Sequence, residues 1–264
     1  MSITSESRRA QIMTVMKDQG RISVPALADQ MKVSQETIRR DLKLLEEAGS
    51  VRRVHGGAVL PSLLIEQPVT ERLGLHRVAK DRIAARAVEL IQEDMSLFLD
   101  PSSSAIALAH ALVGFHKLTI VTNSLEVARI VGERSSNRLI VIGGLYKRED
   151  AAMFGFDPPV LSARYRYDIV FCGIAAITAG HGLMDYEEEE AHLRRALVPA
   201  ARRYVILADK SKFNCMAFVQ ALTFDQITDL ITDAQPPDDI AEALGTAGVA
   251  LHLAGRSSQS PETR

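Results

Sequence analysis

The chain has 264 residues and two cysteines, Cys172 and Cys215, which is enough length for two domains and too few cysteines for a disulfide framework. No apolar run reaches the length of a membrane-spanning helix, and residues 1–9 lack the apolar core of a signal peptide, so we expect a cytoplasmic protein without a membrane partner. The net charge of −2 is unevenly distributed: residues 1–60 carry +3 and the remainder carries −5, which favours a phosphate-rich ligand for the first part only.

The first predicted elements form a small helical module. The spacing of apolar residues predicts a helix over Arg8–Gln19, which Gly20 ends. A short strand over Arg21–Ser23 follows, and Ser23 caps a second helix that has Pro25 in its first turn. This second helix has an apolar face made of Leu27, Ala28 and Met31.

A third helix is predicted over Ser34–Glu47, with Ser34 as its N-cap. Its inward face consists of Ile38, Leu42 and Leu45. Its first turn and its outward face consist of Gln35, Glu36, Thr37, Arg39, Arg40 and Lys43. A basic helix that follows another helix after a short turn is the arrangement of a helix-turn-helix, in which the second helix enters the major groove of DNA.

A two-stranded wing is predicted after this helix. Ser50–Arg53 and Gly57–Val59 can pair across a turn at residues 55–57. We expect Arg52, Arg53 and His55 to lie near DNA phosphates, although His55 could also be a ligand or a proton switch. The alternative for the whole module is an ordinary three-helix domain with a solvated charged face. The spacing, the caps and the basic wing together favour DNA binding.

Residues Val33–Ala58 (VSQETIRRDLKLLEEAGSVRRVHGGA), preceded by RISVPALADQM, resemble the DeoR-type bacterial transcriptional regulators. The resemblance implies a winged helix-turn-helix that binds double-stranded operator DNA, most often as a repressor. It also implies a recognition helix over Ser34–Glu47, with Gln35, Thr37, Arg39 and Arg40 nearest the DNA.

After a loosely patterned linker at 60–78, short apolar strands alternate with helices. This alternation predicts an α/β fold: a larger domain at 79–255 with a mostly parallel sheet, joined to the module at 1–59 and followed by a disordered tail at 256–264. The predicted strands are Ser96–Leu99, Leu118–Val121, Leu139–Ile142, Asp168–Cys172, Tyr204–Ala208, Leu230–Thr232 and Val249–Leu253. The predicted helices are Asp81–Gln92, Ser103–Leu112, Leu125–Gly132, Glu188–Ala200 and Asp238–Ala247.

Polar or glycine-rich segments follow four of these strands. They begin at Asp100, Thr122, Gly143 and Asp209, and they bring Ser102, Ser103, Ser104, Asn123, Gly144 and Lys212 with them. Ligands of parallel sheets bind outside the carboxyl ends of the strands, and hydroxyls at a helix N-terminus suit an anion. We therefore expect a shared pocket for a phosphorylated small molecule. Taken singly, each hydroxyl is more commonly a plain helix cap.

The acidic run at 187–190 is typical of a solvated helix start, but Glu190 could instead face the pocket and accept hydrogen bonds from sugar hydroxyls. The run from Lys80 to Phe213 also resembles the sensor domain of the DeoR family, which is related to sugar-phosphate isomerases and coenzyme A transferases. That resemblance implies a sugar-phosphate effector held by Asp100, Ser102, Ser103, Ser104, Thr122, Asn123 and Lys212. The chain departs from the family at Ser102–Ser104, where many members have glycine followed by two threonines.

Three functions are compatible with the sequence. The first is a sequence-specific regulator, a repressor of a carbohydrate operon that a phosphorylated sugar or polyol releases. The second is an isomerase- or deaminase-like enzyme with an added DNA-binding module, and the third is an architectural protein with an empty pocket. We favour the first, with no catalytic residue, no metal site and no cofactor. A homo-oligomer, a dimer or a tetramer, is expected because recognition of a repeated operator needs two recognition helices.

Overall fold

The computed structural model describes residues 5–19, 21–48, 50–54, 56–59, 66–134, 136–155, 160, 162 and 164–255. The chain divides into two compact units, residues 1–66 and residues 67–264. In the part of the chain that is described, no helix combines the length and apolar character needed to span a bilayer.

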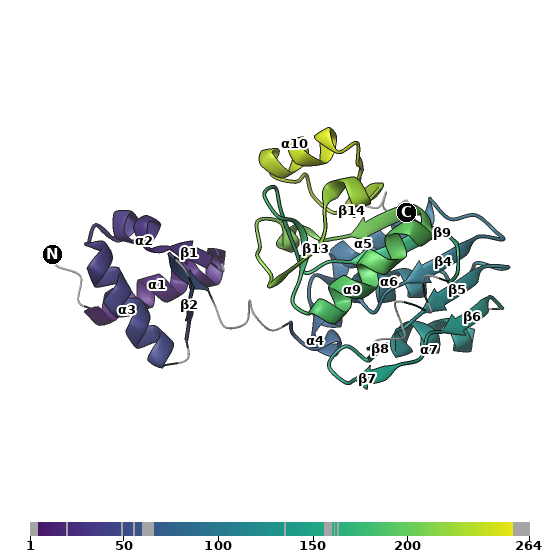
Figure 1. Ribbon diagram of the computed structural model, residues 1–264, viewed down its shortest axis with the longest axis horizontal. Coiled ribbons are helices and arrows are strands. Elements are labelled where there is room, and N and C mark those ends of the chain that lie inside the picture. Colours follow the sequence, from purple (N-terminus) through teal and green to yellow (C-terminus); the bar gives the residue numbers. More distant parts are fainter. Residues whose placement is uncertain are drawn as a thin grey trace, which may run out of the picture. The chain divides into compact units, whose positions relative to one another are not determined.

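The first unit packs three helices against a three-stranded antiparallel sheet (Figure 1). Its elements are α1 (Ser5–Gln19), β1 (Arg21–Ser23), α2 (Val24–Met31), α3 (Gln35–Glu47), β2 (Arg52–Val54) and β3 (Gly57–Val59). Strand β3 lies between β1 and β2. A Cβ on Gly57 would lie 2.3 Å from the backbone oxygen of Ile22, so the close approach of β3 to β1 requires glycine at this position.

Two helices of this unit, α2 and α3, begin where short polar side chains predicted, whereas α1 begins at Ser5, before the predicted start at Arg8. Ser23 accepts a hydrogen bond from the Ala26 amide at 3.2 Å and thereby caps α2. Pro25 lies in the first turn of this helix, where its missing N–H group is not needed. The predicted inward residues Ile38, Leu42 and Leu45 are buried, together with Ile12, Met16, Leu27 and Met31.

The second unit is a three-layer α/β/α structure around a seven-stranded sheet of parallel strands (Figure 1). The sheet order is β15-β14-β12-β9-β4-β5-β6. The strands are β4 (Ser96–Leu99), β5 (Thr119–Thr122), β6 (Arg138–Val141), β9 (Tyr167–Gly173), β12 (Ala201–Leu207), β14 (Asp229–Thr232) and β15 (Ala250–Leu253). Because β5 and β6 extend the sheet to one side of β4 and all later strands extend it to the other, the topological switch point lies between β4 and β9.

Each face of this sheet is covered by its own helices. One buried cluster joins Leu97, Ile169 and Leu207 to the helices α5 (Arg77–Val88), α6 (Ser103–Ala111) and α7 (Leu125–Arg134). The cluster on the other face joins Phe98 and Val170 to α9 (Glu188–Leu197) and α10 (Asp238–Thr246). This alternation along the strands explains their nearly continuous apolar sequence.

The structure differs from the sequence prediction in two places. Residues 69–78, predicted to belong to an irregular linker, contain α4 (Val69–Gly74) and the start of α5. The α4 helix has only six residues, fewer than two turns, so its apolar spacing does not repeat, but Val69 is fully buried against the core. The strands of two small antiparallel sheets were also not predicted: β7 (Leu145–Lys147) with β8 (Ala152–Phe154), and β10 (Ala176–Thr178) with β11 (Gly182–Asp185) and β13 (Val219–Leu222). These strands are short and do not alternate with helices along the chain, and that alternation is what marked the equally short strands of the main sheet.

Candidate functional site

The outer surface of α3 carries the polar side chains that the sequence singled out. Ser34 caps the helix by accepting from the Thr37 amide at 3.2 Å, and its hydroxyl lies 2.9 Å from the Thr37 hydroxyl. Gln35, Glu36, Arg39, Arg40 and Lys43 are exposed, and Thr37 is half-buried. The helix therefore presents a polar surface on one side and packs its apolar side against α1 and α2.

The basic residues of this surface are paired with acids of the same surface. The guanidinium groups of Arg39 and Arg40 lie 3.6 and 3.7 Å from opposite oxygens of Glu36. Arg39 also donates to the amide oxygen of Gln35 at 3.3 Å. One turn later, Lys43 Nζ lies 3.9 Å from Glu47. Pairs as exposed as these are weak, so phosphates can displace the acids from the cations.

The wing is attached to the C-terminal turn of α3 through Glu46. Its carboxylate accepts from the backbone amide of Arg53 at 2.9 Å and pairs with the Arg53 guanidinium at 2.6 Å. Arg53 is thus placed beside the C-terminal turn of α3 and lies in β2, where the sequence predicted the first strand of a wing. The backbone of Arg52 belongs to β2, whereas its side chain and all of His55 lie outside the described residues.

A buried ion pair, Arg8 with Asp41, anchors α3 from behind. The Arg8 Nε lies 2.6 Å from the Asp41 carboxylate, and the side chains are only 12% and 5% exposed. The sequence did not predict this pair. Its only sequence signal is an acid at an otherwise inward position of the third helix.

In the second unit, the four predicted polar segments lie at one edge of the sheet. The parallel register pairs Leu99 with Thr122, and Thr122 with Val141, so the segments after β4, β5 and β6 begin side by side. The segment after β12 leaves the same edge but is separated from β4 by β9. Adjacent strands are about 4.8 Å apart, which places the β12 segment about 10 Å from β4.

Both carboxylate oxygens of Asp100 accept hydrogen bonds from other groups of the chain. One carboxylate oxygen accepts from the Ser102 amide at 3.1 Å, and the other accepts from the Gly173 amide and from Arg194, both at 3.0 Å. Asp100 is 2% exposed. Its role in the structure is to join the end of β4 to the end of β9 at the topological switch point.

Arg194 is the centre of this acidic network, and the sequence analysis missed it. Its guanidinium lies 2.9 Å from Asp185 and 3.9 Å from Glu190, and donates to the Gly173 carbonyl at 3.1 Å. Although burial would lower the pKa of Arg194, the surrounding carboxylates raise it well above its usual value. The predicted Glu190 is therefore buried on α9, beside Arg194 and on the opposite face of the sheet from α6.

The remaining hydroxyl and amide side chains fall into two groups. Ser102 caps α6 through the Ala105 amide at 3.1 Å, and Thr122 donates to the Leu99 carbonyl at 2.7 Å. Asn123 donates to the Met153 carbonyl at 2.9 Å. These three side chains hold the loops together. In contrast, Ser103 and Ser104 are each 6% exposed, and neither hydroxyl has a hydrogen-bond partner among the described residues.

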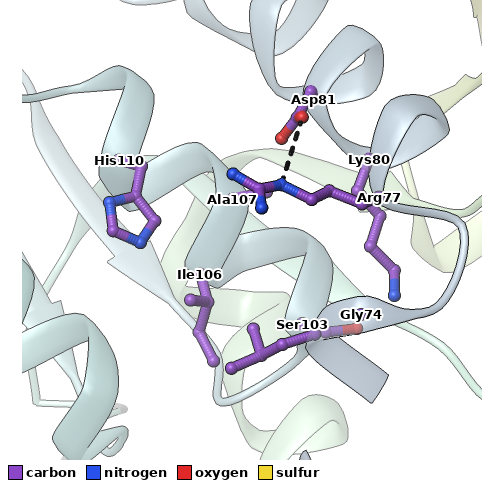
Figure 2. Close-up of a pocket in the computed structure, with 9 residues that line it drawn as sticks. Gly74, Arg77, Lys80, Asp81, Ser103, Ile106, Ala107 and His110 are labelled. Atoms are coloured by element: carbon purple, nitrogen blue, oxygen red, sulfur yellow. Dashed lines mark ion pairs between the residues drawn. The ribbon is translucent and has the colours of Figure 1, made fainter. Parts of the chain in front are cut away.

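Ser103 lines a pocket of about 510 Å³ between the end of α4, α5 and α6. Figure 2 shows Arg77 and Asp81 on the α5 side of the pocket, joined by an ion pair of 3.8 Å, and His110 on the α6 side. Lys80, which is 5% exposed, donates to the Arg72 and Leu75 carbonyls at 2.5 and 2.7 Å. Helix α5 directly precedes β4 and α6 directly follows it, so both helices run antiparallel to the strand. The N-termini of both helices therefore lie at the carboxyl edge of the sheet.

The other predicted residues lie at this edge but do not line the pocket. Gly143 and Gly144 are exposed after β6. Lys212 is half-buried on the turn η3 (Lys210–Lys212) after β12. Two hydroxyls without a partner among the described residues, those of Ser103 and Ser104, thus lie at the start of α6, and two further buried ones, those of Ser162 and Thr232, lie elsewhere. Lys212 lies about 10 Å from the end of β4, across β9.

Comparison with known proteins gives the same division of the chain. Residues 8–63 match the family model of the DeoR-like helix-turn-helix domain, and residues 75–234 match that of the DeoR C terminal sensor domain. The glycerol-3-phosphate regulon repressor of Escherichia coli (strain K12) is 32% identical over 242 residues, covering 92% of this chain and 96% of that protein. The repressor of the same name from Haemophilus influenzae is 33% identical and covers 87% of this chain and 89% of that protein.

A third relative, the HTH-type transcriptional regulator GlpR of Haloferax volcanii, is 32% identical and covers 92% of this chain and 96% of that protein. Solved structures are less similar. Ribose 5-phosphate isomerase A of Methanocaldococcus jannaschii is 18% identical over 55% of each chain, with a TM-score of 0.38. The eIF2B beta subunit of Chaetomium thermophilum is 14% identical over 65% of this chain and 53% of that chain, with a TM-score of 0.46.

Proposed function

Because this chain belongs to the DeoR family of DNA-binding transcriptional repressors, and not to a family of enzymes, we propose that a phosphorylated sugar or polyol controls its affinity for operator DNA. The names of two relatives support this class of effector, since they repress a glycerol-3-phosphate regulon. The DNA-binding residues are those on the outer surface of α3 and on the wing.

One observation supports the effector site most directly: the hydroxyl of Ser103, a residue that is 6% exposed, has no partner among the described residues, and Ser103 lines a pocket of about 510 Å³. That volume is in the range that holds small molecules. The amide groups at the α6 N-terminus suit a phosphate, and so does Lys80; Arg77 would have to exchange its ion pair with Asp81 for one with the phosphate.

The sugar hydroxyls would extend along the segment at 100–104. This segment joins the pocket at Ser103 to the acidic network of Asp100, Asp185 and Glu190 around Arg194. Effector binding at this edge would favour one arrangement of the protomers and operator binding another, so each ligand would change the affinity of the other by the same factor.

We further propose that the active species is a homo-oligomer, a dimer or a tetramer. Residues 1–60 carry a net charge of only +3, which favours weak binding by one copy. Two linked copies on half-sites about 34–36 Å apart would gain affinity through effective concentration.

Thermal unfolding of the full chain tests the effector site. Glycerol 3-phosphate, ribose 5-phosphate and hexose 6-phosphates are compared with glycerol, the free sugars and inorganic phosphate. A true effector at 100 times its dissociation constant should stabilise the fold by about 2.7 kcal/mol. Its unphosphorylated counterpart should not.

Two neighbouring serines supply the matched variants. Ser103→Ala removes a hydroxyl without a partner, so it should leave the free energy of unfolding unchanged and weaken effector stabilisation. Ser102→Ala removes a helix cap and should cost about 1 kcal/mol without effector. If no phosphorylated compound stabilises the chain, or if Ser103→Ala responds as the wild type does, the proposed site is wrong.

A further inference from the structure

Glu36 is an acid in the first turn of the helix that enters the major groove. It is the second residue of α3, its side chain is 64% exposed, and it lies within 3.6–3.7 Å of Arg39 and Arg40. The N-terminal residues of a recognition helix contact base edges. A carboxylate favours the first turn of a helix, but here the surface around it must approach a polyanion.

The environment of Glu36 gives it two effects on DNA binding. On any duplex, its negative charge repels the phosphates and competes with them for Arg39 and Arg40. In the major groove, however, a carboxylate accepts a hydrogen bond from the N4 amino group of cytosine. Only a site that presents cytosine at the right step compensates for the repulsion.

We infer that Glu36 is a specificity-determining residue: it weakens binding to non-operator DNA and selects a cytosine in each operator half-site. The inference rests on the proposed recognition surface of α3. In this scheme Glu36 discriminates between duplexes of different sequence, and Arg39 and Arg40 supply the affinity for any duplex. Releasing Arg39 and Arg40 from Glu36 should therefore strengthen binding to DNA of any sequence.

The helix also supplies a matched control. Glu47 pairs with Lys43 at 3.9 Å and is exposed to a similar degree, 58% against 64%, but it lies in the last turn of α3. Glu36→Gln and Glu47→Gln remove the same charge from the same helix; the first frees Arg39 and Arg40, and the second frees Lys43. The difference is that Glu36 lies at the N-terminal end of α3, which is proposed to contact bases, and Glu47 lies at the C-terminal end.

The test uses the full chain and the duplexes that the wild type enriches from a random library. Fluorescence anisotropy at fixed salt measures the dissociation constants of the wild type, Glu36→Gln and Glu47→Gln for an enriched duplex and for a permuted duplex of equal composition. We expect Glu36→Gln to bind the permuted duplex more tightly. The ratio of the two constants should fall at least about fivefold in this variant, the lower limit for one base contact, and should change less than about twofold in Glu47→Gln.

A double-mutant cycle then identifies the base. Replacing the preferred C·G pair by T·A should weaken the wild type and leave Glu36→Gln nearly unaffected. Three results would overturn the inference while leaving DNA binding by α3 intact. The ratio could stay unchanged in Glu36→Gln, or it could fall equally in Glu47→Gln. The C·G replacement could also cost the wild type and Glu36→Gln the same affinity. If the wild type enriches no duplex, the recognition surface itself is wrong.

Discussion

Arg194 Nη2 lies 3.0 Å from Asp100 Oδ2, and this ion pair joins helix α9 to the segment after β4. The two side chains are 8% and 3% exposed. Both belong to the topological switch point, where the ends of β4 and β9 meet. The ion pair therefore connects the helices on one face of the sheet to the N-terminus of α6 on the other.

Loss of Arg194 should destabilise the second unit strongly. Arg194→Met would leave Asp100, Asp185 and Glu190 without their shared cation, and removing one partner of a buried pair costs about 3–5 kcal/mol. Arg195→Met is the control, because Arg195 pairs with Glu188 at the surface and should cost under about 1 kcal/mol. Urea unfolding followed by tyrosine fluorescence measures both, since all five tyrosines belong to residues 67–264. Equal stabilities of the two variants would contradict this role.

Gly173 is predicted to tolerate no side chain. A Cβ at this position would lie 2.4 Å from Ser102 Cβ and 2.6 Å from its hydroxyl, so Gly173→Ala must displace either β9 or the start of α6. We expect a loss of about 1–3 kcal/mol and a weaker response to the effector. Gly143→Ala, which meets no atom within 4 Å, is the matched control. A Gly173→Ala protein with wild-type stability would show that the contact relaxes without cost.

Asp229 should contribute to loss of stability in acid. Burial would raise its pKa, but hydrogen bonds from Arg203, Thr228 and His252 together lower that pKa below its ordinary value. Its stabilisation is therefore complete above the unfolded-state pKa of about 3.9 and is lost as the pH falls from there through the lower folded-state pKa. Asp229→Asn should be less stable at pH 7 and should lose less stability than the wild type between pH 5 and pH 3. Parallel stability profiles in urea would contradict the assignment.

Lys212 tests how far the proposed effector site extends along the sheet edge. Lys212→Ala should reduce stabilisation by a phosphorylated sugar, whereas Lys210→Ala, an exposed cation on the same turn, should not. Isothermal titration calorimetry with the compound that stabilises the chain most measures the difference. A wild-type dissociation constant for Lys212→Ala would limit the site to the pocket beside α6.

Sequence patterns located the elements that depend on local chemistry. Ser34 and the apolar spacing of Ile38, Leu42 and Leu45 predicted α3 to within one residue, and the apolar runs predicted every strand of the seven-stranded sheet. The parallel order of those strands explains why the segments beginning at Asp100 and Thr122 lie together.

Contacts between distant residues were not predictable in the same way. Arg194 is 94 residues from Asp100, and nothing in its own neighbourhood distinguishes it from Arg195, which is exposed to solvent far more. Likewise, the pocket depends on the parallel packing of α5 and α6, whereas the predicted helix began at Asp81 and omitted Arg77 and Lys80. In both cases the role of the residue depends on how deeply its side chain is buried, and that burial arises only when the sheet and its helices assemble.

The coupling between the two ligands tests the account most directly. The dissociation constant of the full chain for an enriched duplex is measured with and without a saturating phosphorylated sugar, and that of the sugar is measured with and without the duplex. The account predicts that both constants change by the same factor and in the same direction. A sugar phosphate that binds at the α6 pocket and leaves the affinity for DNA unchanged would contradict it.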